Sequence, residues 1–191
     1  MLPLRRPLPE FRLRGYVPSE GELLEVSRAD LEGSWTLLAT YPADFDPFST
    51  LLLLALLDGT PGGARALALG TDKLEAHVAW ARSERLLDDV CFPLLSDPSA
   101  TLVRALGALD PSSGRPMPAV FLISPEVRVA AVSAFETRVC PSPGEIRRTT
   151  LAFMAEGEGV FPPDWEPGGE PVPSSLDLAG RLYTVYRRGR G

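Results

Sequence analysis

The 191-residue sequence contains only two cysteines, Cys91 and Cys140, and a single histidine, His77. The cysteines lie 49 positions apart and form no CxxC motif, a pattern that favours free thiols in a reducing cytoplasm over a disulfide framework. A metal site built from soft ligands needs three or four Cys or His side chains, more than this spacing offers. The composition therefore predicts no structural disulfide, no metal centre and no bound cofactor.

Long apolar runs are also missing. The longest, from Leu51 to Leu57, is far shorter than the ~20 residues needed to span a bilayer. The first residues, "MLPLRRPLPEF", are broken by three prolines and lack the apolar region of a secretory signal. We therefore expect a cytoplasmic protein that has no membrane partner.

Positive charge is scarce, since the formal net charge is −6 at pH 7. A nucleic-acid-binding protein needs a basic face, and the short clusters "LRRP" and "RRGRG" near the two ends are too small to form one. No nucleic-acid partner is predicted. The chain is, however, 45% hydrophobic and long enough for one well-buried core.

The predicted elements alternate between strands and helices. Strands are expected over residues 9–16 (a short edge strand), 21–26, 35–41, 64–70, 91–97, 119–124 and 127–135. Helices are expected from Phe48 or Ser49 to Gly59, over 71–87 with a cap at Thr71 or Asp72, and over 98–109 and 142–156. The last two strands are close enough to form an antiparallel hairpin. This order predicts an α/β protein of thioredoxin-like fold, with a central mixed sheet flanked by helices.

Five stretches in one register resemble the peroxiredoxin family: "YPADF", "AHVAWAR", "FPLLSDPSATLVRALGALD", "VFLISPEVRVAAV" and "VFPPDWEPG". They are most similar to the two-cysteine kind that includes alkyl hydroperoxide reductase, and the resemblance covers about residues 7 to 170. It implies a thioredoxin-like domain over residues 1–170, followed by a C-terminal extension or dimer arm over 171–191. It also implies association into a homodimer or higher oligomer, or with an active relative.

The resemblance implies thiol peroxidase chemistry, in which a peroxidatic cysteine becomes a sulfenic acid and a resolving cysteine then forms a disulfide with it. In this chain the peroxidatic position falls on Ser49 and the resolving position on Phe161. The pocket proline is kept as Pro42, whereas the pocket threonine falls on Asp46 and the pocket arginine on Pro118. A serine has no sulfur to oxidise, so a degenerate member without the family mechanism is predicted.

Ser49 is open to two further interpretations. It is expected to cap the following helix or to lie in its first turn. Alternatively it is a nucleophile, although His77 is the only imidazole base, is expected to be a packing residue, and no GxSxG motif is present. Asp44 and Asp46 are expected to be solvated turn residues rather than a carboxylate pair. Arg115 is close enough in sequence to Pro118 to reach the same pocket, but it stands in a predicted exposed loop.

The two cysteines supply the competing hypothesis. Cys91 is expected to be a small buried residue, whereas Cys140, in the proline-rich stretch "VCPSPGE", is expected to be more exposed and to have its pKa lowered by Arg138. The sequence therefore predicts a peroxiredoxin-like pseudoenzyme with a scaffold or partner-binding role. The alternative is an active thiol peroxidase or redox sensor that uses Cys140, Cys91 or both.

Overall fold

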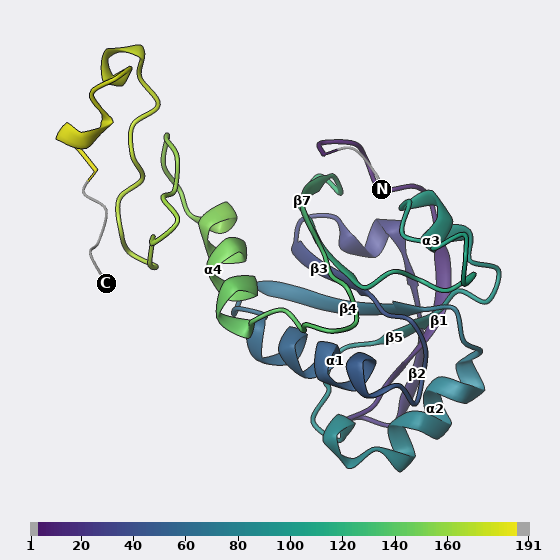
Figure 1. Ribbon diagram of the computed structural model, residues 1–191. Helices are drawn as coiled ribbons and strands as arrows, with labels where there is room; N and C mark the ends of the chain where they lie inside the picture. Colours follow the sequence, from purple (N-terminus) through teal and green to yellow (C-terminus); the bar gives the residue numbers. More distant parts are fainter. Residues whose placement is uncertain (1–3, 187–191) are drawn as a thin grey trace.

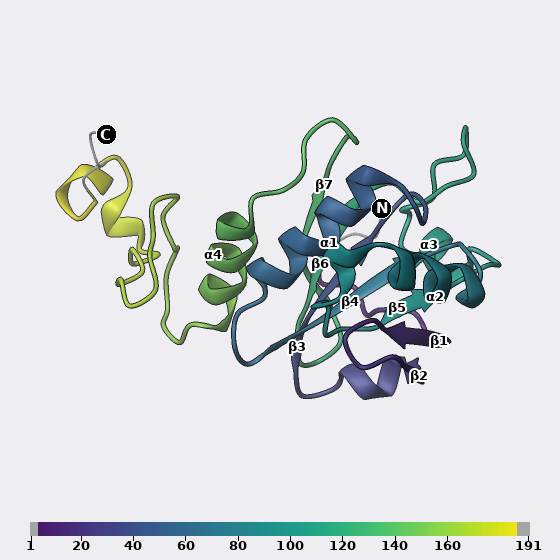
Figure 2. The same ribbon diagram turned by 90° about the horizontal axis from the view of Figure 1, so that it is seen from below.

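A computed structural model describes residues 4–186 and shows a single mixed sheet with helices on both faces (Figures 1 and 2). The strands are β1 (Arg12–Val17), β2 (Glu22–Ser27), β3 (Trp35–Thr40), β4 (Ala64–Gly70), β5 (Leu94–Ser96), β6 (Ala119–Ile123) and β7 (Val129–Ala134). The α-helices are α1 (Pro47–Gly59), α2 (Leu74–Ser83), α3 (Thr101–Ala105) and α4 (Pro143–Met154). Short 3₁₀ turns complete the list: η1 (Arg28–Leu31), η2 (Arg85–Leu87), η3 (Leu176–Leu178) and η4 (Leu182–Thr184).

The sheet has the order β2-β1-β5-β4-β3-β6-β7. The strands β3, β4 and β5 are parallel neighbours, and their apolar sequences are almost wholly buried, as the two continuous runs predicted. The antiparallel hairpin of β6 and β7 is confirmed. The prediction of an edge strand over residues 9–16 is wrong, because β1 lies between β2 and β5 and β2 takes the edge instead.

Two apolar layers cover the sheet. The helices α1, α2 and α4 lie on one face, where Leu52, Leu56, Trp80 and Ile146 pack against the sheet (Figure 1). The short α3 and the N-terminal segment cover the other face (Figure 1). Because the parallel strands all end at the same edge of the sheet, the loops that follow β3, β4 and β5 meet there.

Several helix boundaries differ from the prediction. The helix α2 begins at Leu74, without a side-chain cap from Thr71 or Asp72, because Asp72 binds another loop. The helix α3 is only five residues long. At the start of α3, the buried Asp97 carboxylate accepts the backbone N–H groups of Thr101, Leu102 and Val103. After the helix, Gly107 has a φ of 63°, which turns the chain away from the helix axis.

Beyond α4, the residues from 156 to 186 form an extended arm that lies away from the sheet (Figures 1 and 2). Its only regular elements are the turns η3 and η4. The basic cluster "RRGRG" lies outside the described residues. Among residues 4–186, no helix has both the length and the apolar character needed to cross a membrane.

The strand edge at Gly70 generates a prediction about stability. A Cβ atom built on Gly70 would lie 2.7 Å from Cζ of Tyr41, a ring that is fully buried and packs against Trp80. We expect Gly70→Ala to lower the free energy of unfolding by about 1–3 kcal/mol, measured in urea. The matched control is Gly62→Ala, where a Cβ meets nothing within 4 Å. Equal stability of both variants would show that the ring yields.

Candidate functional site

The candidate site lies where the chain leaves β3 and enters α1. Tyr41 follows the strand, and the turn over residues 42–46 leads to Pro47, the first residue of the helix. Within this turn Phe45 has a left-handed backbone (φ 59°), which is unfavourable for a residue with a side chain. The turn sends the two aspartates to different partners: Asp44 is buried against His77, and Asp46 binds the first turn of α1.

Ser49, which the resemblance predicted at the peroxidatic position, is fully buried in the first turn of α1. Its backbone N–H donates to Oδ2 of Asp46 at 2.9 Å, and its hydroxyl donates to the same oxygen at 3.0 Å. Asp46 is therefore the N-cap, and of the two expected positions for Ser49, the cap or the first turn, the structure shows the first turn. Asp46 supplies the acceptor three residues earlier, so the serine is the group that is capped.

The only histidine, His77, is not placed to act as a base for Ser49. The ring nitrogens of His77 face Asp44, Tyr41 and the backbone oxygen of Leu95 instead. The Ser49 hydroxyl hydrogen is held by a carboxylate that is itself the helix cap. This geometry gives no support to a serine hydrolase.

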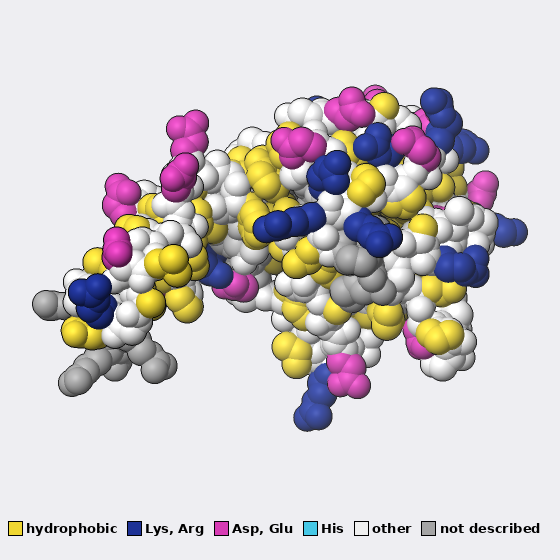
Figure 3. Space-filling model, turned by 90° about the horizontal axis from the view of Figure 1, so that it is seen from above, with side chains coloured by type: hydrophobic (Ala, Val, Ile, Leu, Met, Phe, Trp, Pro, Cys, Tyr) yellow, Lys and Arg dark blue, Asp and Glu magenta, His cyan; other side chains and the backbone are white. Residues whose placement is uncertain are grey.

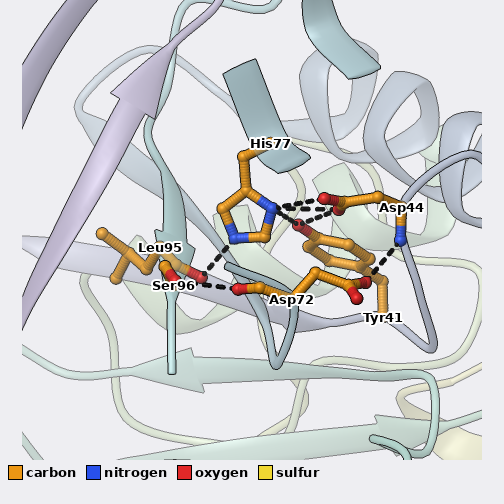
Figure 4. Close-up of polar contacts among 6 residues, drawn as sticks. All are labelled: Tyr41, Asp44, Asp72, His77, Leu95 and Ser96. Carbon is orange, nitrogen blue, oxygen red and sulfur yellow. Dashed lines mark hydrogen bonds and ion pairs between the residues drawn. The ribbon is translucent and has the colours of Figure 1, made fainter. Parts of the chain in front are cut away.

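A buried polar network surrounds Tyr41 and His77 (Figure 4). The side chains of His77 and Asp44 are 0% and 2% exposed, and Nδ1 of His77 lies 2.8 Å from Oδ2 of Asp44. The Tyr41 hydroxyl lies 3.1 Å from Oδ1 of Asp44. The interpretation of Asp44 as a solvated turn residue is therefore wrong, and His77 is a buried polar partner rather than only a packing residue.

The network continues to the next two strands. Asp72, which follows β4, accepts the backbone N–H of Asp44 at 2.8 Å, and the hydroxyl of Ser96 in β5 donates to the backbone oxygen of Asp72 at 2.8 Å (Figure 4). Burial raises the pKa of Tyr41 well above its usual value, and the neighbouring Asp44 carboxylate raises it further. Tyr41 is thus a permanent hydrogen-bond donor.

The remaining family positions are spread over the chain. Pro118 is buried beside the end of β3, because the residue that follows it, Ala119, pairs with Thr40. The backbone carbonyl of Pro118 accepts the N–H of Phe135 at 2.9 Å. Phe161 lies in the C-terminal arm, with its ring 5.0 Å from that of Trp165. Arg115 is exposed in its loop, as predicted. The junction therefore brings together Pro42, Asp46 and Ser49, with Pro118 at the neighbouring strand and Phe161 elsewhere.

The two free cysteines occupy environments opposite to those expected. Cys91 is exposed, whereas Cys140 is half-buried, with its Sγ 3.8 Å from the backbone oxygen of Phe48 in α1. Burial raises the pKa of the Cys140 thiol, and the Asp46 carboxylate raises it further. The expected lowering by Arg138 is therefore wrong, since desolvation and a like charge outweigh any effect of that guanidinium.

The Tyr41–Asp44–His77 network was not predicted from the sequence. The sequence did carry one indication of this network: the only histidine of the chain stands in a helix that also carries buried apolar residues. A buried imidazole requires polar partners, so such a position predicts a polar network around it. Within residues 4–186, no group of three or more Cys, His, Asp or Glu side chains is arranged to hold a metal ion.

The cap at Asp46 generates a second prediction. Asp46→Ala removes the acceptor for both donors of Ser49, so we expect a loss of about 1–2 kcal/mol in the free energy of unfolding in urea. Asp58→Ala, at the exposed C-terminal end of the same helix, is the control and is expected to cause no loss, because a negative charge there opposes the helix dipole. Similar losses in both variants would contradict the capping role.

Comparison with known proteins agrees with the resemblance. The family model described as "AhpC/TSA family" matches residues 4–132. The chain is 29% identical to an alkyl hydroperoxide reductase C of Staphylococcus haemolyticus over 180 residues, which cover 90% of this chain and 95% of that one. It is 31% identical to peroxiredoxin 1 of Sulfuracidifex metallicus over 159 residues, which cover 78% and 74% of the two chains.

Solved structures show the same fold. AhpC of Enterococcus faecalis superposes with a TM-score of 0.74 at 25% identity, over 81% of this chain and 93% of that chain. The reduced 2-Cys peroxiredoxin of Plasmodium vivax gives a TM-score of 0.78 at 20% identity, over 88% and 92%. The predicted thioredoxin-like fold is confirmed. Because the family model matches more than half of its length, the chain belongs to the AhpC/TSA family.

Proposed function

We propose that this chain is a peroxiredoxin-like pseudoenzyme, which has lost the family's thiol peroxidase activity and keeps the fold for association with other protein chains. The buried Ser49, bound through both its backbone and its hydroxyl to Asp46, is the observation that carries the proposal. Peroxide reduction by the family mechanism forms an S–O bond while the O–O bond breaks, and it needs a thiolate at this position. Ser49 has no sulfur, and a hydroxyl is far less acidic than the thiol it would replace.

The surroundings of Ser49 support the same conclusion. The Asp46 carboxylate places a negative charge where the family needs a thiolate, and like charges oppose each other's formation. Pro118 has no side-chain donor to hold a peroxide oxygen, and Phe161 has no sulfur for a resolving disulfide. All four changes fall on positions of chemical importance, while Pro42 and the strand–turn–helix frame remain.

A second candidate function deserves a test because Cys140 packs against the first turn of α1, next to the altered position. In this alternative, Cys140 is the thiol that attacks peroxide. Its raised pKa argues against this role, because a protonated, half-buried thiol is a poor nucleophile. Cys91 is exposed, but it lies on the loop that leads to β5 and no contact joins it to Cys140.

Association of two copies of the chain is supported by the arm and by β7. In the arm over residues 156–186, Leu176 is 93% exposed and Tyr183 is 73% exposed, and hydrophobic side chains gather along it in Figure 3. Only Trp165 is a buried hydrophobic residue of this segment. The strand β7 ends the sheet; its first residue, Val129, bonds to the backbone of Arg5 and Arg6, and the rest of its outer edge pairs with no other strand among residues 4–186. We therefore propose a homodimer in which the arm of one copy covers the other, or an equivalent assembly with an active relative.

A peroxide assay tests the loss of activity. The purified protein, with dithiothreitol as reductant, is treated with substoichiometric hydrogen peroxide, and peroxide decay and cysteine oxidation by mass spectrometry are followed together. We expect decay at the rate of an ordinary free thiol, with Cys140 oxidised no faster than the exposed Cys91.

The matched control for this assay is Cys140→Ser, which is expected to leave peroxide decay unchanged apart from the loss of one thiol. Fast, selective oxidation of Cys140 with turnover, abolished in the variant, would overturn the pseudoenzyme proposal in favour of the second function.

The association is tested by light scattering after size exclusion. We expect about twice the 20.6 kDa of one chain at micromolar concentration. The double variant Leu176→Asp with Tyr183→Asp is expected to shift the protein toward monomer, because it places charge in the covered apolar surface. Leu23→Asp, at an exposed position of β2, is the control and should not change the mass. A monomeric wild-type protein would contradict the proposal.

A further inference from the structure

The protons held by His77 depend on its buried surroundings and not on the proposed function. Both ring nitrogens of this buried histidine face oxygen atoms that accept hydrogen bonds (Figure 4). Nδ1 lies 2.8 Å and 3.0 Å from the two carboxylate oxygens of Asp44, and Nε2 lies 3.3 Å from the backbone oxygen of Leu95. A neutral imidazole has one N–H donor, so it satisfies only one of these two directions.

Each neutral form of His77 leaves a buried repulsion. With hydrogen on Nδ1 alone, the lone pair of Nε2 points at the carbonyl of Leu95. With hydrogen on Nε2 alone, the lone pair of Nδ1 points at the Asp44 carboxylate. The Tyr41 hydroxyl has a single hydrogen and donates it to Asp44, so the same hydrogen does not also satisfy Nδ1. Protonation of both ring nitrogens removes every one of these conflicts.

The charges around the ring also favour a protonated His77. The groups that face it are the Tyr41 hydroxyl at the end of β3, the Asp44 carboxylate in the following turn and the Leu95 carbonyl in β5, with the Asp72 carboxylate bound to the backbone of Asp44. Among residues 4–186, His77 is the only basic side chain within ion-pair distance of Asp44, and none is within that distance of Asp72. A buried carboxylate without a cation is costly.

We propose that His77 carries a proton on each ring nitrogen in the folded protein and forms a buried ion pair with Asp44. The shared proton resides on the imidazole rather than on the carboxyl group, because imidazole is the more basic of the two. The imidazolium joins α2 to the turn before α1 through Nδ1 and to the backbone of β5 through Nε2. The pair is therefore a proton-binding site that ties together the loops at the C-terminal edge of the parallel strands.

Nuclear magnetic resonance of ¹⁵N-labelled protein tests the proposal directly. The chain has one histidine, so every imidazole signal belongs to His77. At pH 7.5 we expect both ring nitrogens to show a directly bonded proton, because each of them faces an acceptor oxygen. A wild-type spectrum in which either nitrogen lacks its proton would overturn the proposal, and this measurement requires no variant.

Two variants identify the partner. Asp44→Asn removes the negative charge while keeping an oxygen acceptor, and we expect His77 to lose one of its two ring protons at pH 7.5. Asp72→Asn is the matched control, because Asp72 binds the backbone of Asp44 and not the ring, and both ring protons should persist. Two protons retained in Asp44→Asn, or one lost equally in both variants, would overturn the assignment of Asp44 as the partner.

Discussion

The contact between Asp44 and His77 is the interaction on which the arrangement of this region depends. Strand β3, the turn that follows it and helix α2 have few other polar links, and the pair joins them inside the apolar core. The Tyr41 hydroxyl donates a second hydrogen bond to the Asp44 carboxylate, and the centre of the Tyr41 ring lies 5.6 Å from that of Trp80. A buried polar network of this kind is stable only when each member finds its partner, so it specifies one arrangement of the turn.

The frame and the chemistry of the family site are therefore physically separable. The frame consists of the strand ends, the network and the helix start, and all of them rest on burial and hydrogen bonds within the chain. The chemistry of the family rests on a thiolate, a donor to the peroxide and a resolving thiol, and the residues that we propose at their positions are Ser49, Pro118 and Phe161. A fold that does not draw its stability from its reactive group survives the replacement of that group.

The fold was largely predictable from the sequence, because continuous apolar runs identify the strands β3, β4 and β6 and the order of elements limits the topology. The position of β1 inside the sheet was not, since a short polar strand carries no signal of its neighbours. At the site, the alignment of motifs located Ser49 and Asp46, but their hydrogen bond depends on the left-handed residue Phe45, which no propensity indicates. The exposures of Cys91 and Cys140 depend on long-range packing and were predicted the wrong way round.

The bond between Asp46 and Ser49 also bears on what a substitution at this site would do. A cysteine introduced at position 49 would lie against the same carboxylate, so formation of its thiolate would be disfavoured. Replacing Asp46 alone would remove the N-cap of α1 and would not create a peroxide-reducing residue, because Ser49 has no sulfur. On the proposed function, neither single substitution would supply peroxide chemistry, because a thiol beside Asp46 keeps the opposing charge, and the loss of Asp46 alone leaves no sulfur at position 49.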